Sequence, residues 1–204
     1  MRYWWVNQGK TYREEREGGY LWSPKRKRGR DGEATVRNPF YEYMRDVAPG
    51  DMVFSYRDGH VVSCGLITSY GYDSPKPSEF GKNGKNWSQF GWRVNVTYFE
   101  ASPFRPKDQL QRISPFLSEE HAPLKADGGG KELYLTKISP EFAGVIIDAL
   151  GAPARACREE GRHLSLHDTT EDFADTLAEQ AGEYLVDRVK QDIQIPETTR
   201  LAIV

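Results

Sequence analysis

Short apolar runs separated by glycine and proline predict a chain built mainly of β-strands. Two of these runs flank Arg57-Asp58-Gly59, a turn sequence that predicts a β-hairpin. Another run alternates, so that Trp92 and Val94 share one face of the expected strand. The strands are expected over residues 3–8, 51–56, 60–70, 91–100 and 131–138.

Three short helices are expected between and after these strands. Asn38-Pro39 opens the first, which runs to about Val47, because asparagine caps a helix and proline suits its first position. Residues 106–113 form the second, and Ser139-Pro140-Glu141 caps the third, which ends at Leu150. The order β–α–β–β–β–α–β–α predicts an α+β fold, a strongly curved sheet or small open β-barrel with short flanking helices.

The pattern changes after residue 150. Residues 151–167 are interpreted as a linker, and residues 171–191 as a single helix with apolar spacings of three, four and seven. Pro196-Glu197 begins what is expected to be another helix. We therefore expect one domain over residues 1–150, and a linker with a helical connector over residues 151–204 that leads to a missing domain.

The charge follows the same division. The chain of 204 residues has a net charge of −2, but residues 151–204 hold six Lys/Arg against eleven Asp/Glu, which is −5. Residues 1–150 therefore carry +3, with 23 of the 25 aromatic residues and all five tryptophans. The net charge of the whole chain argues against a nucleic-acid partner. The weakly basic, aromatic domain over residues 1–150 is compatible with one.

Several function classes lack their motifs. Cys64 and Cys157 form no CxxC, so a disulfide framework or thiolate zinc site is not expected, and an intracellular, reducing setting is favoured. The i, i+4 pair His163 and His167 lacks the HExxH pattern, so no metal is expected. The sequence contains no phosphate-loop, dinucleotide-binding or nucleophile-elbow motif, so no cofactor is expected. It contains no apolar run of the length of a membrane span, so no membrane partner is expected.

The residues with the strongest chemical signal are tryptophans beside basic side chains. Trp22 lies in a charged, glycine-punctuated stretch and directly precedes a basic run, while Trp87 lies among lysine, asparagine and serine. Aromatic rings interleaved with cations suit a protein that stacks a splayed base and holds the nearby phosphates. The basic run consists of Lys25, Arg26, Lys27, Arg28 and Arg30.

Simpler interpretations stay open for each of these residues. Trp5 and Trp92 suit a core equally well, and a basic run alone suits a solvated loop. Asn7 and Gln8 can read a base edge, or can bond the backbone at the end of their strand. Cys64 is interpreted as a buried strand residue rather than a nucleophile.

At these residues the sequence resembles an EVE domain, a member of the PUA-like superfamily that also contains YTH domains. The similarity covers about residues 1–150 in a consistent order. It is carried by Tyr3-Trp4-Trp5-Val6-Asn7-Gln8, Tyr20-Leu21-Trp22-Ser23-Pro24-Lys25, the hairpin from Phe54-Ser55 to Cys64-Gly65, Trp87-Ser88-Gln89 and Trp92-Arg93-Val94.

The chain also resembles the N-terminal part of EVE–HNH proteins, which are modification-dependent restriction endonucleases of prokaryotes. The matching segments are YWWVNQ, GGYLWSPK, RNPFYE, VAPGD and SPKPSEFG. This resemblance implies a helical connector to an HNH nuclease, a role in antiviral defence and a cytoplasmic location. Because the chain has no HNH motif, it is not expected to be an enzyme itself, and a homodimer through the C-terminal helical region is a further expectation.

The resemblance implies that 5-methylcytosine or 5-hydroxymethylcytosine is flipped from double-stranded DNA into an aromatic cage. Trp22 and either Trp87 or Trp92 would form its walls. Four polar residues, Asn7, Gln8, Ser23 and Ser69, would read the base. The phosphates would be held by Lys25, Arg26, Lys27, Arg28, Arg30, Lys82 and Lys85.

Three other functions stay open. A YTH-like reader of methylated RNA is the nearest, since it keeps the fold and changes only the ligand. An enzyme acting on nucleotides or small molecules would use the cage as its active site. An interaction domain would make the basic run incidental.

Overall fold

The structure is a computed structural model that describes residues 1–27 and 37–167, with side chains as far as residue 165. The expected phosphate-binding residues Arg28 and Arg30 lie outside the described residues, as do the helix expected over residues 171–191 and the one expected at Pro196. The chain divides into two units, residues 1–165 and 166–204, and the first of these carries the fold.

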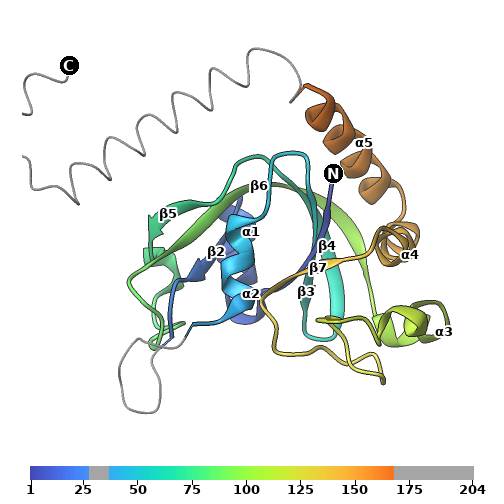
Figure 1. The fold of residues 1–204 in the computed structure, drawn as a ribbon, viewed down its shortest axis with the longest axis horizontal. Coiled ribbons are helices and arrows are strands. Elements are labelled where there is room, and N and C mark those ends of the chain that lie inside the picture. The colour runs from blue at the N-terminus through green and yellow to red at the C-terminus, as the bar shows by residue number, and fades with distance from the viewer. Residues whose placement is uncertain (28–36, 168–204) are drawn as a thin grey trace, which may run out of the picture. The chain divides into compact units, whose positions relative to one another are not determined.

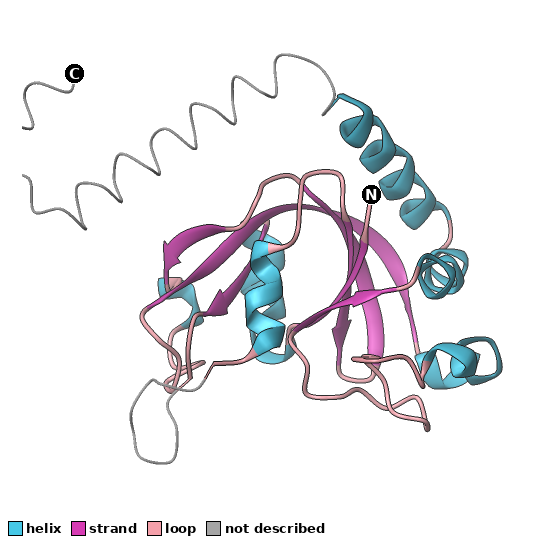
Figure 2. Ribbon diagram, viewed as in Figure 1, coloured by secondary structure: helices cyan, strands magenta, loops and turns pink. Residues whose placement is uncertain are grey.

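Seven strands form one mixed, strongly curved sheet with the order β2-β6-β4-β3-β1-β7, and β5 pairs with β6 outside this path (Figures 1 and 2). β1 and β3 are parallel, and the other pairs are antiparallel. This α+β, open-barrel arrangement confirms the expected fold class. The strands are β1 (Tyr3–Asn7), β2 (Tyr20–Pro24), β3 (Met52–Arg57), β4 (His60–Ile67), β5 (Tyr72–Pro75), β6 (Phe90–Phe104) and β7 (Leu135–Ile138).

Short helices connect and cover the sheet. In Figure 1, α3, α4 and α5 follow one another along one side of it. The α-helices are α1 (Tyr12–Gly18), α2 (Pro39–Glu42), α3 (Leu110–Ile113), α4 (Pro140–Leu150) and α5 (Ala152–His167). Single 3-10 turns cover Gly9–Thr11, Tyr43–Arg45, Ser78–Phe80, Pro106–Gln109 and Ser114–Phe116. No helix among the described residues is long and apolar enough to cross a membrane.

Strand alternation puts the two tryptophans of β1 into two different cores. Trp4 packs inside the curved sheet, and Trp5 packs on its outer side, where its ring lies 6.2 Å from that of Phe142 in α4. Trp4 and Trp5 are 2% and 1% exposed. Trp5 is therefore a core residue, the simpler of its two interpretations.

Several expected elements are confirmed. The β3–β4 hairpin turns at Asp58 and Gly59, with φ of 49° and 82°. Ser139 caps α4 by accepting a hydrogen bond from the backbone N–H of Phe142, and Asn38 caps α2 in the same way. The strand expected over residues 91–100 is longer, because β6 has 15 residues and pairs first with β2 and β5 and then with β4.

Three segments contain structure where no helix or strand was expected. Residues Tyr12–Gly18 form α1, residues Tyr20–Pro24 form the edge strand β2, and residues Tyr72–Pro75 form β5. The last expected strand is shorter than residues 131–138, since β7 begins only at Leu135. The edge strand β2 is the element that carries Trp22 and Ser23.

The interpretation of residues 151–167 as a linker is wrong, because they form helix α5. Ala154 and Cys157 are fully buried in the core cluster that contains Cys64. At Gly161, an added Cβ would lie 2.9 Å from the Gly50 carbonyl oxygen and 2.9 Å from the Leu66 side chain. Small residues therefore let α5 approach the sheet closely, and α5 belongs to the folded unit.

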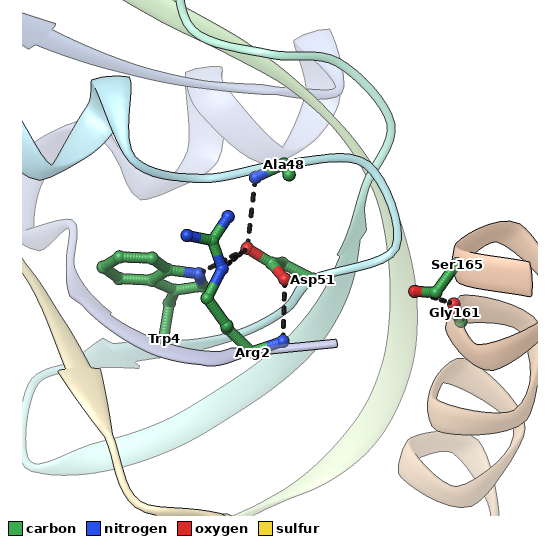
Figure 3. A network of polar contacts seen from close by, with 6 residues as sticks. All are labelled: Arg2, Trp4, Ala48, Asp51, Gly161 and Ser165. Atoms are coloured by element: carbon green, nitrogen blue, oxygen red, sulfur yellow. Dashed lines mark hydrogen bonds and ion pairs between the residues drawn. The ribbon is translucent and has the colours of Figure 1, made fainter. Parts of the chain in front are cut away.

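The N-terminus is fixed by a buried carboxylate beside α5 (Figure 3). Asp51, which is 3% exposed, accepts hydrogen bonds from the backbone N–H and Nε of Arg2 at 2.7 and 3.0 Å. It also accepts from Trp4 Nε1 at 2.9 Å and from the Ala48 N–H at 3.1 Å. One side chain thus ties β1 to the turn before β3.

We expect Asp51→Ala to lower the free energy of unfolding by about 3 kcal/mol, because it leaves the buried indole N–H of Trp4 and several other donors without an acceptor. Urea denaturation of both proteins would measure this difference. Asp148→Ala is the matched control, since Asp148 forms an exposed ion pair with Arg112, and it should change stability by less than about 1 kcal/mol. Equal losses for the two variants would contradict the role given to Asp51.

Candidate nucleic-acid interface

Four aromatic residues, which we call the aromatic cluster, pack together on one face of β2. They are Tyr20, Trp22, Phe80 and Trp87. The ring of Trp22 meets that of Phe80 edge-on at 5.7 Å and lies 6.0 Å from that of Trp87, tilted by 34°. Trp87 therefore has apolar neighbours, contrary to what its polar flanking sequence suggested.

Trp22 is a packing residue in this arrangement, since only 1% of it is exposed. Its Nε1 donates to the Ser74 carbonyl oxygen at 3.4 Å. Gly91 lies against the ring so closely that an added Cβ would be 2.5 Å from it. The ring is thus enclosed by Phe80, Trp87 and the backbone of β6.

The two indoles are too close to hold a base between them. Stacked bases lie about 3.4 Å apart, so a sandwiched base needs roughly twice that distance between parallel rings. Trp22 and Trp87 are 6.0 Å apart and not parallel. Trp87 is half-buried, so it is the more accessible ring of this pair.

Trp92 and Ser23 lie on the opposite face of the same strands. Ser23 pairs with Trp92, whereas Trp22 pairs with Arg93, and adjacent residues of a strand point to opposite faces. Trp92 packs against the interior core, and the buried Ser23 hydroxyl donates to the Tyr41 carbonyl oxygen at 3.3 Å. The structure thus brings Trp87, and not Trp92, to Trp22.

The other residues expected to read a base have partners within the chain. Asn7 Nδ2 donates to the Lys131 carbonyl oxygen at 3.1 Å. Ser69 accepts from the Asn95 N–H at 2.9 Å, which extends the pairing of β4 with β6. Neither belongs to the aromatic cluster, and Gln8 is bound in a buried network on the other side of β2.

This network, which we call the polar seam, consists of Gln8, Thr11, Glu15, Tyr98 and Tyr134. Glu15 is fully buried and accepts from Thr11 Oγ1 at 2.6 Å and from Gln8 Nε2 at 2.8 Å. Gln8 Oε1 is buried without a partner. Burial raises the pKa of Glu15 to about 8, although the donated hydrogen bonds act in the opposite direction.

The polar seam holds the backbone of the edge strand that carries Trp22. The Tyr134 hydroxyl donates to the Trp22 carbonyl oxygen at 2.8 Å, and the Tyr98 hydroxyl donates to that of Tyr20 at 3.1 Å. The Trp22 N–H bonds to Glu15. Trp22 is therefore positioned from both sides, its ring by the aromatic cluster and its peptide groups by the seam.

Basic residues border the aromatic cluster because residues 25–27, which follow β2, still pair with residues 87–90. Ser88 N–H bonds to the Arg26 carbonyl oxygen at 3.0 Å, and Lys27 forms a bridge with Trp87. We call residues 25–27 and 87–92 together the aromatic rim. Its cations lie near rings, with Lys25 Nζ at 5.7 Å from Trp92 and Lys27 Nζ at 5.0 Å from Tyr41.

The basic side chains are not equally available for phosphates. Lys25 forms an ion pair with Asp73 at 2.5 Å, which neutralises part of its charge. Lys76, which the sequence did not single out, donates to the Asn83 carbonyl oxygen at 2.5 Å and so fixes the loop before Trp87. Arg26, Lys82 and Lys85 are exposed.

Sequence reasoning missed Phe80, Tyr41, Glu15 and Tyr134. Phe80 lies in a segment for which no element was expected, and Tyr41 lies in the helix expected from Asn38. Tyr134 meets Trp22 across 112 residues of chain. No local pattern signals such contacts.

A cavity of about 290 Å³ lies away from the aromatic cluster and contains none of the expected pocket residues. It is lined by Tyr43, Glu120, His121, Thr136, Lys137, Ile138, Ser139 and Pro140.

Comparisons with known proteins give structural likeness at low sequence identity. No family model matches the chain, and no curated protein matches it. The Pseudomonas syringae protein PSPTO5229 is 12% identical over 73% of this chain and 99% of its own, with a TM-score of 0.46. A hypothetical protein from Leishmania major is 11% identical over 78% and 96%, also with a TM-score of 0.46. Human THYN1 protein, solved in complex with DNA containing 5-methylcytosine, is 13% identical over 74% and 99%, with a TM-score of 0.41.

Proposed function

We propose that this chain is a DNA-binding domain that recognises a modified cytosine, 5-methylcytosine or 5-hydroxymethylcytosine, in double-stranded DNA. The observation that supports this most is the aromatic rim, where backbone pairing holds three consecutive basic residues against a segment with two half-buried tryptophans. Cations beside aromatic rings fit a ligand that combines phosphates with flat bases.

The modified base would be flipped out of the duplex and stacked on Trp87. Flipping costs a few kcal/mol, and stacking on one aromatic ring recovers about 1–3 kcal/mol. A methyl group buried against the ring adds about 0.8 kcal/mol, which corresponds to roughly four-fold in affinity. Trp22 would support the site from below as the packed partner of Trp87.

The biological setting belongs to the same proposal. The resemblance to EVE–HNH proteins supports a specificity domain of a modification-dependent restriction endonuclease in a prokaryotic cytoplasm. The nuclease would be an HNH domain outside this chain, so the chain itself would bind DNA and not cut it. A homodimer through the C-terminal helical region is also proposed, and sedimentation of the chain with and without DNA would test it.

A duplex binding panel at one salt concentration tests the proposed function. Because human THYN1 protein was solved with 5-methylcytosine DNA, that base is the first probe. The others are 5-hydroxymethylcytosine, unmodified cytosine and N6-methyladenine in the same sequence. We expect the chain to bind the methylated duplex at least about four-fold more tightly than the unmodified one. Equal affinity for all four duplexes would refute the proposal.

Two variant pairs show whether the aromatic rim carries the binding. Trp87→Ala should weaken the methylated complex about ten-fold, whereas the control Tyr72→Ala, at an exposed ring of β5, should not.

Lys27→Ala should reduce the slope of log K against log salt by about one, and Lys137→Ala on β7 should leave it unchanged.

Methylated RNA is the second candidate ligand, since stacking rings and cations suit single-stranded RNA equally well. A protein that reads RNA makes use of the 2′-hydroxyl. Tight binding of an N6-methyladenine RNA, together with no preference for methylated duplex DNA, would favour this candidate over the proposed function.

A further inference from the structure

Arg93 of β6 is a basic side chain on the face of the sheet that carries the aromatic cluster. It pairs with Trp22 of β2, and cross-strand partners in a sheet share a face. Its guanidinium carbon lies 3.9 Å from the centre of the Tyr20 ring, which belongs to the cluster. This stacking orients the guanidinium, so Arg93 is a positioned cation rather than a freely moving surface charge.

The protein does not use the hydrogen-bonding groups of Arg93. Its Nε is buried and has no partner. In the part of the chain that the structure describes, the side chain makes neither a hydrogen bond nor an ion pair. The Glu79 carboxylate accepts instead from the Tyr20 hydroxyl at 2.7 Å. A half-buried guanidinium without an acceptor has lost water and gained no partner, and an anionic ligand would supply one.

The lysine that follows β2 does not take this place. Lys25 Nζ lies 5.7 Å from the Trp92 ring and forms an ion pair with Asp73. Asp73 is the strand partner of Trp92, so this ion pair lies on the opposite face from the aromatic cluster. A ligand on the cluster face therefore meets Arg93 and not Lys25.

Arg93 also lies close to the ring on which the modified base is proposed to stack. Trp87 packs against Trp22 at a ring separation of 6.0 Å, and Trp22 is the cross-strand neighbour of Arg93. Neighbours of this kind have Cβ atoms about 5 Å apart. The phosphates that flank a nucleotide stacked on Trp87 therefore come within reach of the Arg93 side chain.

We propose that Arg93 binds a phosphate next to the flipped nucleotide, on the strand that carries the modified base. This inference rests on the proposed function, because only a nucleotide taken out of the duplex places its base on Trp87. The guanidinium donates two parallel hydrogen bonds to phosphate oxygens while its face stays on Tyr20. Arg93 thereby holds the backbone of the flipped nucleotide, and it recognises the flipped conformation rather than the methyl group.

The test couples Arg93 to single phosphates. The probes are duplexes with one 5-methylcytosine, in which the phosphate on either side of that base is replaced, one at a time, by an uncharged methylphosphonate. We expect one replacement to weaken wild-type binding about ten-fold and to leave the binding of Arg93→Met unchanged, since this variant has already lost the contact. On the unaltered duplex, Arg93→Met should bind about ten-fold more weakly and reduce the slope of log K against log salt by about one.

Two further variants are the controls. Arg93→Lys should keep the salt slope and recover part of the affinity, because lysine binds a phosphate as a point charge. Arg57→Met removes another arginine over a tyrosine ring, at 5.6 Å from Tyr12, but Arg57 pairs with Asp58 in the β3–β4 hairpin and its loss should leave binding unchanged. Methionine keeps the apolar stem of arginine, so these variants should melt within a few degrees of the wild type, which circular dichroism would check.

Three outcomes would overturn the inference. Arg93→Met could lose further affinity at both methylphosphonates, it could bind like the wild type, or it could keep the full salt slope and change only the preferred flanking bases. Each of these is compatible with a wild-type preference for methylated over unmodified DNA. Equal wild-type affinity for those two duplexes, measured in the same series, would instead refute the proposed function, so the two failures are distinguishable.

Discussion

Trp22→Ala is expected to lower the free energy of unfolding by about 3–5 kcal/mol, the range for removing a fully buried large aromatic side chain. Trp22 is 1% exposed and packs against Phe80, Trp87 and Gly91. Removing its ring leaves a cavity under Trp87 and an unpaired carbonyl oxygen at Ser74. Urea denaturation followed by far-UV circular dichroism would measure the loss.

The comparison with Trp87→Ala makes this result informative. Trp87 is half-buried, so its removal should cost less stability than that of Trp22, about 1–2 kcal/mol, while it removes the ring on which a base can stack. If Trp22→Ala folded with nearly wild-type stability and failed only to bind DNA, the packing role assigned to Trp22 would be wrong. A cage open on the Trp22 side would then be the better description.

The second large effect is a pH dependence of stability that arises from Glu15. Because burial raises the pKa of Glu15 from 4.5 to about 8, the folded protein keeps a proton that the unfolded chain releases above pH 4.5. The stabilisation is complete below pH 4.5 and is lost as the pH rises through 8. One pKa unit corresponds to about 1.4 kcal/mol, so the free energy of unfolding should fall by about 5 kcal/mol between these limits.

Glu15→Gln should abolish this slope, because glutamine keeps the hydrogen-bonding shape without ionising. The variant should be more stable than the wild type at pH 8 and above. Glu17→Gln in the same helix is the matched control, since Glu17 is exposed and pairs with Arg13, and it should keep the wild-type slope. Denaturation series at pH 5, 6, 7 and 8 would decide, and the same flat profile for wild type and Glu15→Gln would contradict the assignment.

Local patterns predicted the elements that bury one clear apolar face. The hairpin of β3 and β4, strand β6 and the capped helix α4 all carry alternation, turn or cap signals in their own residues. Helix α1 has no such signal, because its sequence YREEREG is almost entirely charged. Its one buried residue is a glutamate, Glu15, whose partners include Gln8, directly after β1, and Tyr134, directly before β7.

Helix α5 was missed for a different reason. The residues by which it contacts the sheet are Ala154, Cys157 and Gly161. Small residues contribute little to a hydrophobic periodicity, and they act by letting backbones approach closely. A polar helix of this kind resembles a linker until the surface it packs against is known.

The sequence predicted which types of residue form the candidate site, but it did not predict which of these side chains contact one another. The tryptophans and the basic run were recognised from their unusual sequence context, and backbone pairing does bring residues 25–27 to residues 87–90. Which ring faces which depends on the register of β2 with β6, where a shift of one residue would exchange Trp22 for Ser23. Register between strands so far apart in sequence is set by the tertiary fold.

The polar seam has a consequence for how copies of this protein behave at high concentration. β2 lies at the end of the sheet, and an edge strand normally offers free N–H and C=O groups to which a strand of another molecule can add. Here the hydroxyls of Tyr98 and Tyr134 occupy the carbonyl oxygens of Tyr20 and Trp22, and Glu15 takes the Trp22 N–H. Side chains of the same molecule thus cap this edge, which protects the domain against aggregation by strand addition.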